Sequence, residues 1–141
     1  MPLRLIPEIH RATHRIGIFL DGLGITQGEG HILSHLAASG DATIAELHRT
    51  LAHRRSTLTS TLDRLADRGW ITRESDPHDR RSFIIRLSKN GKKVAGKIYR
   101  ELAQLEGQAL REVSKVDLRS LVTILQSLEN AADQAARRKK G

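Results

Sequence analysis

The chain has 141 residues, a formal net charge of +8 from 24 basic and 16 acidic side chains, and no cysteine. This length fits one domain, or one domain with an oligomerisation extension, and the lack of cysteine excludes a disulfide framework and thiolate metal sites. Charges interrupt the stretch from Met1 to Phe19 and no apolar run approaches the roughly 18 residues of a membrane span, so we expect a cytoplasmic protein without signal peptide or membrane contact.

Basic residues are in excess, and the sequence pI is about 10.6. Such an excess favours polyanionic partners such as nucleic acid. Four of the basic residues form the terminal run Arg137-Arg138-Lys139-Lys140, a segment that we expect to fray. The case for nucleic acid therefore depends on where the other charges lie.

Apolar residues at three- and four-residue steps predict an amphipathic first helix over residues 7–22, followed by helix-ending glycines. The apolar positions are Leu3, Ile6, Ile9, Ile16, Leu20 and Leu23. Thr26 and Glu29 then have the spacing of a capping box, in which each side chain accepts a hydrogen bond from a free backbone N–H at the start of a helix. They predict a second helix, which Ser39-Gly40-Asp41 ends.

A second capping box, Thr43 and Glu46, predicts a short helix through Leu47 and Leu51, followed by a turn at His53-Arg54-Arg55. The next helix presents two faces. It buries Leu58, Leu62 and Leu65, and it exposes Ser56, Ser60, Asp63, Arg64 and Asp67, flanked by Thr57 and Thr59. The pair is typical of a helix-turn-helix, in which small polar side chains approach base edges in the major groove. The alternative is the solvated face of an ordinary helical bundle.

Residues 70–88 are typical of a β-hairpin, since two strand-like runs flank a turn that ends in Arg80 and Arg81. Arg68-Gly69 ends the preceding helix. The second strand alternates Phe83, Ile85 and Leu87 against Ile84 and Arg86. Adjacent arginines at a hairpin tip repel each other, whereas beside phosphates each replaces released counterions. The hairpin therefore predicts a basic wing, so that the element order is four helices, the wing and two helices.

Two further helices are predicted after Ser88-Lys-Asn-Gly91, over residues 92–113 and 117–136, with Ser114 and Asp117 as a cap between them. The stripe of the first is Val94, Ile98, Leu102, Leu105, Ala109 and Val113, and that of the second is Leu118, Leu121, Val122, Leu125, Leu128, Ala132 and Ala135. Such stripes would be exposed on a monomer, so they favour pairing between two chains. The alternative is packing within one chain.

The order of these motifs resembles the core pattern of the MarR family of winged helix-turn-helix transcriptional regulators, over about residues 26 to 95. The resemblance is carried by Ser56-Thr-Leu-Thr59, Leu62-Asp-Arg-Leu65, Arg68-Gly-Trp-Ile71, Arg73, Asp79-Arg-Arg81 and Leu87-Ser-Lys-Asn-Gly91. It implies a homodimer with interlocked first and last helices, a recognition helix in the major groove and a wing in the minor groove. It also implies that Asp79 braces the wing while Arg81 touches DNA. Ser88 stands where the family often has threonine and keeps the hydroxyl cap.

We therefore expect a mainly α fold with a small β-wing: an N-terminal dimerisation helix in residues 1–24, a winged helix-turn-helix DNA-binding domain in residues 25–90, and C-terminal dimerisation helices with a basic tail in residues 91–141. The function expected is that of a dimeric, sequence-specific regulator on a pseudo-palindromic double-stranded DNA operator, a repressor released by a small aromatic or anionic effector. Ser56, Thr57, Thr59, Ser60 and Arg64 are expected to face the major groove, Arg80 and Arg81 the minor groove, and Arg54, Arg55 and Arg73 the phosphates.

Asp63 and Asp67 leave two interpretations open, because each could pair with a neighbouring arginine or accept a hydrogen bond from a cytosine amine. A sequence-tolerant architectural DNA-binding protein is an alternative function with the same charge. An enzyme is not expected, since no phosphate-binding glycine loop and no nucleophile turn is recognisable. No cofactor is expected.

Histidines form two pairs one helical turn apart, His10 with His14 and His31 with His35. This spacing can present two imidazoles to one metal ion, which leaves a metal-responsive regulator as another alternative. Two histidines do not complete the usual tetrahedral set, so no metal site is expected. Because effectors of the family bind between the dimerisation helices and the winged domain, the resemblance makes His10, Arg11 and His14 candidate ligand-binding residues.

Overall fold

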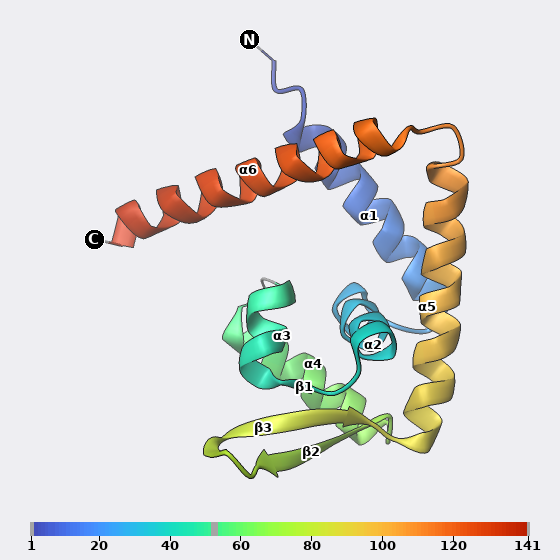
Figure 1. Ribbon diagram of the computed structural model, residues 1–141, viewed down its shortest axis with the longest axis vertical. Helices are drawn as coiled ribbons and strands as arrows, with labels where there is room; N and C mark the ends of the chain where they lie inside the picture. Colours follow the sequence, from blue (N-terminus) through green and yellow to red (C-terminus); the bar gives the residue numbers. More distant parts are fainter. Residues whose placement is uncertain (1, 52–53, 141) are drawn as a thin grey trace. The chain divides into compact units, whose positions relative to one another are not determined.

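The computed structural model describes residues 2–51 and 54–140, and His53 of the expected turn lies outside them. The elements are α1 (Ile6–Gly22), α2 (Gln27–Ser39), β1 (Ala42–Thr43), α3 (Ile44–Leu51), α4 (Arg55–Asp67), β2 (Ile71–Asp76), β3 (Asp79–Leu87), α5 (Lys89–Ala109) and α6 (Lys115–Lys140) (Figure 1). The mainly helical fold with a small β-wing is thus confirmed. There are two compact units, the first up to Leu102 and the second from Ala103. The expected three-part division into domains stays a prediction.

Both predicted capping boxes are present, and they set the starts of α2 and α3. In the first, Thr26 Oγ1 accepts from the Glu29 N–H at 3.1 Å and Glu29 Oε1 accepts from the Thr26 N–H at 2.9 Å. In the second, Thr43 and Glu46 exchange the same two bonds at 3.1 and 3.2 Å. Each box satisfies two backbone donors that the first turn of a helix leaves free. The local sequence therefore determines where these helices begin.

One apolar cluster holds α2, α3, α4 and the sheet together, and we call it the winged core. Its members include Ile32, Leu33, Leu36, Leu47, Leu58, Leu62, Leu65, Ile71, Ile85 and Ala95. A second cluster packs Ile98 of α5 with Leu20 and Ile25, so α5 joins the end of α1 to this unit. Close approach at the start of α5 requires a glycine, because a Cβ on Gly91 would lie 1.8 Å from the backbone oxygen of Trp70. The core positions α4 and the wing as one body.

The sheet has three antiparallel strands in the order β1-β3-β2, one more than the hairpin predicted from sequence. The additional strand is β1, in which Ala42 is opposite Ile85. The predicted alternation in β3 holds for Ile85, which is fully buried, and for Arg86, which is exposed. It is wrong for Phe83, which is exposed because it lies opposite Ser75 toward the hairpin end. The wing therefore projects beyond the winged core.

The last two helices differ from the predicted ranges 92–113 and 117–136 at both of their ends. Helix α5 ends at Ala109, and Val113, expected in its stripe, follows in a turn where the Val113 N–H donates to the Leu110 carbonyl at 3.0 Å. This bond spans three residues instead of four, which closes the helix. Helix α6 continues through the basic run that was expected to fray, since cations are favourable at the negative end of the helix dipole. None of the helices in residues 2–51 and 54–140 is long and apolar enough to cross a bilayer.

Candidate nucleic-acid interface

The outward face of α4 carries the side chains expected in the major groove, and all of them are exposed. These are Ser56, Thr57, Thr59, Ser60 and Arg64. The hydroxyl of Thr59 donates to the Arg55 carbonyl at 2.9 Å, and that of Ser60 donates to the Thr57 carbonyl at 3.1 Å. A hydroxyl has one proton and two acceptor sites, so these two oxygens remain able to accept. The face can therefore receive hydrogen bonds from amino groups on base edges.

A buried threonine positions the arginine of this face. Thr61 is 1% exposed, and its hydroxyl donates to the Thr57 carbonyl at 2.8 Å while accepting from Arg64 Nη2 at 3.2 Å. Arg64 is thus held against α4, with its remaining donors available. Thr61 was not predicted to have a role, because a threonine between outward and inward positions of a helix gives no separate signal.

The start of α4 is positively charged. Arg54 is the N-cap residue with an extended backbone, and its side chain makes no capping hydrogen bond. Arg54 and Arg55 are both exposed, so two guanidinium groups lie beside backbone N–H groups at the positive end of the helix dipole. This combination is suited to a phosphate group.

One ion pair joins α4 to the wing and bears on the question left open for Asp63. Arg73 Nη2 of β2 lies 2.7 Å from Asp63 Oδ1. Asp63 is thus paired with a neighbouring arginine, while Asp67 is exposed. Arg73, expected at the phosphates, is therefore held toward α4, and it aligns the first strand of the wing with that helix.

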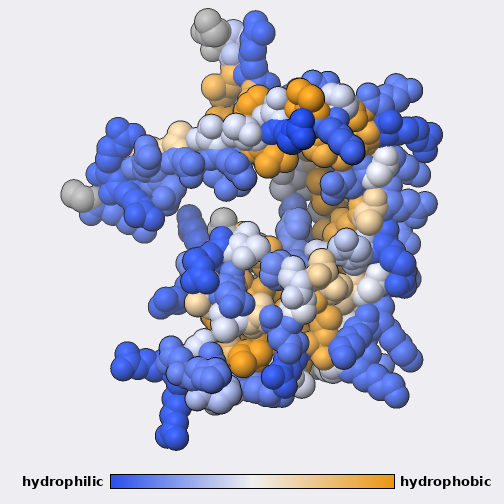
Figure 2. All heavy atoms as spheres, viewed as in Figure 1, coloured by the Kyte–Doolittle hydropathy of each residue, from blue (hydrophilic) through white to orange (hydrophobic). Residues whose placement is uncertain are grey.

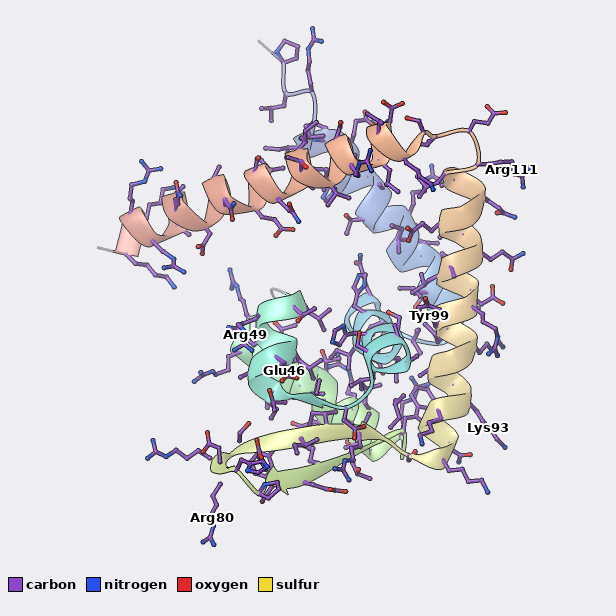
Figure 3. All side chains as sticks on the ribbon, viewed as in Figure 1. Glu46, Arg49, Arg80, Lys93, Tyr99 and Arg111 are labelled. Atoms are coloured by element: carbon purple, nitrogen blue, oxygen red, sulfur yellow. The ribbon has the colours of Figure 1, made fainter. Side chains whose placement is uncertain are left out.

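The wing is braced by carboxylates at its turn and at its base. Asp79 Oδ1 accepts from the Arg81 N–H at 3.0 Å. At the base, Arg86 lies 3.0 Å from Asp41 and 3.1 Å from Glu74, which ties β3 to both of its flanking segments. Arg80 and Arg81 are exposed and have no ion pair within the part of the chain that the structure describes, and Arg80 points away from the hairpin (Figure 3). The wing thus has a rigid base and a cationic tip.

Arg68 was predicted only to end a helix, but its guanidinium group contacts Glu29 of α2, Gly24 before α2 and Trp70 before β2. Arg68 Nη1 lies 3.3 Å from Glu29 Oε2, and both terminal nitrogens donate to the Gly24 carbonyl at 3.1 Å. The group also lies 4.1 Å from the centre of a ring of Trp70. Glu29 is 3% exposed, so Arg68 supplies the charge partner of a buried carboxylate. The only sequence signal was the spacing of arginine and tryptophan around Gly69.

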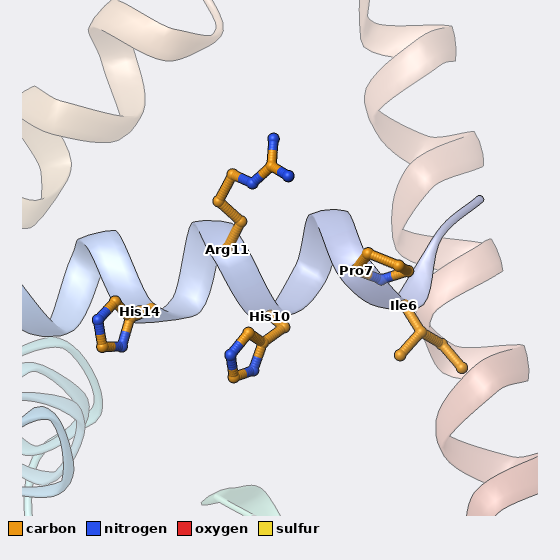
Figure 4. A pocket seen from close by; sticks show the side chains of 5 residues that line it. All are labelled: Ile6, Pro7, His10, Arg11 and His14. Carbon is orange, nitrogen blue, oxygen red and sulfur yellow. The ribbon is translucent and has the colours of Figure 1, made fainter. Parts of the chain in front are cut away.

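The three candidate ligand residues line one open pocket on α1. Its lining is Ile6, Pro7, His10, Arg11 and His14 (Figure 4). The imidazole rings of His10 and His14 are stacked, with centroids 6.2 Å apart and planes at 15°. Arg11 projects from the other side of α1 in Figure 4. Among residues 2–51 and 54–140 there is no group of three or more side chains that could hold a metal ion.

Similarity to known proteins is found over the same part of the chain that carries the candidate interface. The sequence profile of the MarR family matches residues 23–82, the stretch that contains the capping boxes, α4 and the tip of the wing. The multiple antibiotic resistance protein MarR of Escherichia coli is 29% identical over 110 residues, which is 77% of this chain and 74% of that protein. The chain is thus similar to regulators of the MarR family over its winged helix-turn-helix region. This similarity supports the winged-helix transcriptional regulator that the motifs in the sequence predicted, and it fits the expectation that the protein is not an enzyme.

Solved structures of the MarR family have the same fold. The regulator NMB1585 of Neisseria meningitidis superposes with a TM-score of 0.83 at 16% identity, covering 96% of this chain and 95% of that one. A MarR variant from Escherichia coli, in complex with operator DNA, superposes with a TM-score of 0.71 at 24% identity and covers 89% of this chain and 91% of that one. The winged core and the helices around it are thus the architecture of the family.

Proposed function

We propose that the protein is a homodimeric repressor that binds a pseudo-palindromic double-stranded DNA operator and releases it when a small aromatic or anionic effector binds. The observation that carries the proposal is the exposed hydroxyl and arginine face of α4 next to a wing whose tip arginines have no ion pair among the described residues. The related MarR variant solved with operator DNA supports it. Together the two elements are suited to adjacent grooves of one duplex.

Each side chain has a proposed role that follows from its contacts. Thr59 and Ser60 accept from base amino groups, and Arg64 donates to guanine or to a phosphate. Arg54 and Arg55 bind a phosphate at the start of α4. Arg81, with its backbone fixed by Asp79, enters the minor groove, and Arg80 binds there or at the flanking phosphate. Arg73 mainly orients the wing through Asp63.

A homodimer is supported by the apolar surface of α6. None of its residues is buried, and Val116, Leu121, Val122 and Ile124 are 62%, 44%, 45% and 49% exposed. A helix with such a stripe is stabilised when another surface covers it, at about 25 cal/mol per Å² of apolar area. Two-fold pairing of identical chains is the commonest way to do so. It would also place two α4 helices on one pseudo-palindromic operator.

The effector site proposed is the pocket on α1. Ile6 and Pro7 supply apolar contact, and the stacked rings of His10 and His14 offer a flat surface for an aromatic ring. Arg11 lies on the other side of α1, 3.8 Å from Glu8, so it adds positive charge near the pocket and not a direct contact beside the two rings.

A titration on the DNA upstream of the protein's own gene tests the proposal. We expect the Arg81→Ala variant to lose about 1–3 kcal/mol of binding free energy if the arginine reads the groove. Arg137→Ala is the matched control, because Arg137 is ion-paired with Asp133 on α6, away from α4 and the wing in sequence. Unchanged affinity of the Arg81 variant would remove the wing from the mechanism. Equal affinity of the wild type for upstream and competitor DNA would instead indicate an architectural binder.

A further inference from the structure

The first half of α5 carries a concentration of positive charge that the proposed DNA-reading elements do not use. Between Lys89 and Arg100 there are five basic residues and no acidic one. We call these five residues the basic stripe: Lys89, Lys92, Lys93, Lys97 and Arg100. All five are exposed. The stripe thus holds five positive charges in a chain whose net charge is +8.

The charges of the basic stripe are unfavourable for the helix that carries them. No acidic residue lies in the first turn of α5, so its lysines stand at the positive end of the helix dipole, where cations are disfavoured. Lys89, Lys93 and Lys97 also follow each other at four-residue spacing, where like charges on one helix face repel. A local arrangement that lowers helix stability without a compensating contact is characteristic of a functional surface.

No compensating ion pair exists within residues 2–51 and 54–140. Arg73, Arg86 and Arg137 each have a carboxylate within 4 Å, whereas none of the five cations of the basic stripe has one. The contrast shows that acidic partners are available elsewhere on the surface of the protein. The stripe is thus a set of exposed cations whose counter-charge has to come from outside this part of the chain.

The basic stripe faces away from the winged core. Helix α5 buries Gly91, Ala95 and Ile98, and at about 100° per residue Lys93 and Arg100 lie nearly opposite these positions. Figure 3 shows Lys93 pointing outward from α5 on the other side of the first unit from Arg80 of the wing. In Figure 2 hydrophilic side chains project along the same outer side of α5. The stripe is about 17 Å long at 1.5 Å per residue.

We propose that the basic stripe is a second contact surface for the phosphate backbone of double-stranded DNA, outside the base pairs that α4 and the wing read. A polyanion with one charge per about 1.7 Å of axis matches closely spaced cations on a straight helix. Lysine and arginine at phosphates add affinity and salt dependence without base selectivity. The inference deepens the proposed function and rests on it, because it assigns flanking DNA to the same regulator.

The test compares two full-length variants that each lose three positive charges. The first carries Lys93→Gln, Lys97→Gln and Arg100→Gln, and the control carries Arg138→Gln, Lys139→Gln and Lys140→Gln. Both are titrated, beside the wild type, on a duplex trimmed to the protected operator and on the same duplex extended at both ends, over a range of salt concentrations. On the extended duplex we expect the stripe variant to bind roughly tenfold or more weakly at low salt, with a salt slope lower by about 2 to 3.

On the trimmed duplex no loss of affinity is expected. The stripe variant should bind this duplex as tightly as the wild type does, and its preference for operator over competitor DNA should not change. The proposal would be overturned if the stripe variant bound the extended duplex as tightly as the wild type does. It would also be overturned if the stripe variant lost no more affinity than the control variant, or lost the same affinity on both duplexes. Melting without DNA should stay the same or rise as repulsion is removed, so a lower melting temperature would reveal structural cations and contradict it as well.

Failure of the proposed function is distinguishable from failure of this inference. If the wild type shows no preference for its upstream DNA, sequence-specific regulation is wrong. The basic stripe then still predicts the difference in salt slope between the two variants on long competitor DNA. If that difference is missing too, the contact with DNA through α5 is also wrong.

Discussion

The winged core and helix α6 both have apolar residues at three- and four-residue spacing, but only the winged core buries these residues. In the winged core the leucines at three- and four-residue spacing are buried, as Leu33, Leu47 and Leu62 show. In α6 no residue is buried, including the leucines and valines at the corresponding spacing. Apolar periodicity therefore identifies the face of a helix that needs to be covered, but not which surface covers it. The winged core is stabilised by its own packing, whereas in the proposed dimer a second chain covers the apolar stripe of α6.

The largest effect is expected for a truncation inside the winged core. Leu62 is 1% exposed in the middle of α4, and Leu62→Ala should lower the free energy of unfolding by about 2–5 kcal/mol, because it removes apolar contacts and leaves a cavity. Urea denaturation followed by circular dichroism at fixed protein concentration measures this. A decrease below about 1 kcal/mol, the size of an average substitution, would show that α4 is not anchored by this core.

A smaller loss of unfolding free energy is expected on removing Arg68, which contacts Glu29 of α2 and the Gly24 carbonyl between α1 and α2. Arg68→Ala removes the partner of the buried Glu29 and two hydrogen bonds to Gly24, which should reduce the unfolding free energy by about 1–3 kcal/mol. Arg49→Ala, at an exposed arginine of α3, is the control. Adding Glu29→Gln to the Arg68 variant should recover part of the loss, since it removes the unpaired charge. Additive losses in this double-mutant cycle would contradict a direct coupling.

The smallest effect on unfolding is expected in α6. Leu121 is 44% exposed, so Leu121→Asn should change the unfolding free energy by no more than about 0.5 kcal/mol when both proteins are monomeric. In the proposed dimer the same change places an amide in an apolar interface, and sedimentation equilibrium should show a shift toward monomer. Thr123→Asn, also exposed on α6, serves as the control. An unchanged association constant for the Leu121 variant would remove this part of α6 from the interface.

Several features of the fold and of the candidate interface were readable in the sequence because they depend on neighbouring residues. The capping boxes at Thr26 and Thr43 need only a hydroxyl and a carboxylate three residues apart, and both formed as predicted. Helix α4 was likewise identified from the period of its leucines. Asp79 accepts from the Arg81 N–H two residues further on, which is also a local contact.

Other features depend on residues far apart in the chain and gave no usable pattern. Strand β1 has two residues, which is too short for any alternation, and it exists because Ala42 meets Ile85. Arg68 reaches Gly24 across a separation of 44 residues, and no spacing rule connects them. The exposure of Phe83 follows from where the core ends and not from the strand pattern itself.

The sequence by itself therefore determined the order of the helices and of the wing, the capped starts of α2 and α3, the resemblance to the MarR family and the basic character of the wing, since these follow from local hydrogen bonding, periodicity and motif order. Only the tertiary structure decided that Asp63 pairs with Arg73, that Arg68 neutralises a buried carboxylate, and that the cations of α5 face away from the winged core. The physical reason is that ion pairing and burial depend on distances through space, which the chain acquires only when its apolar faces pack together.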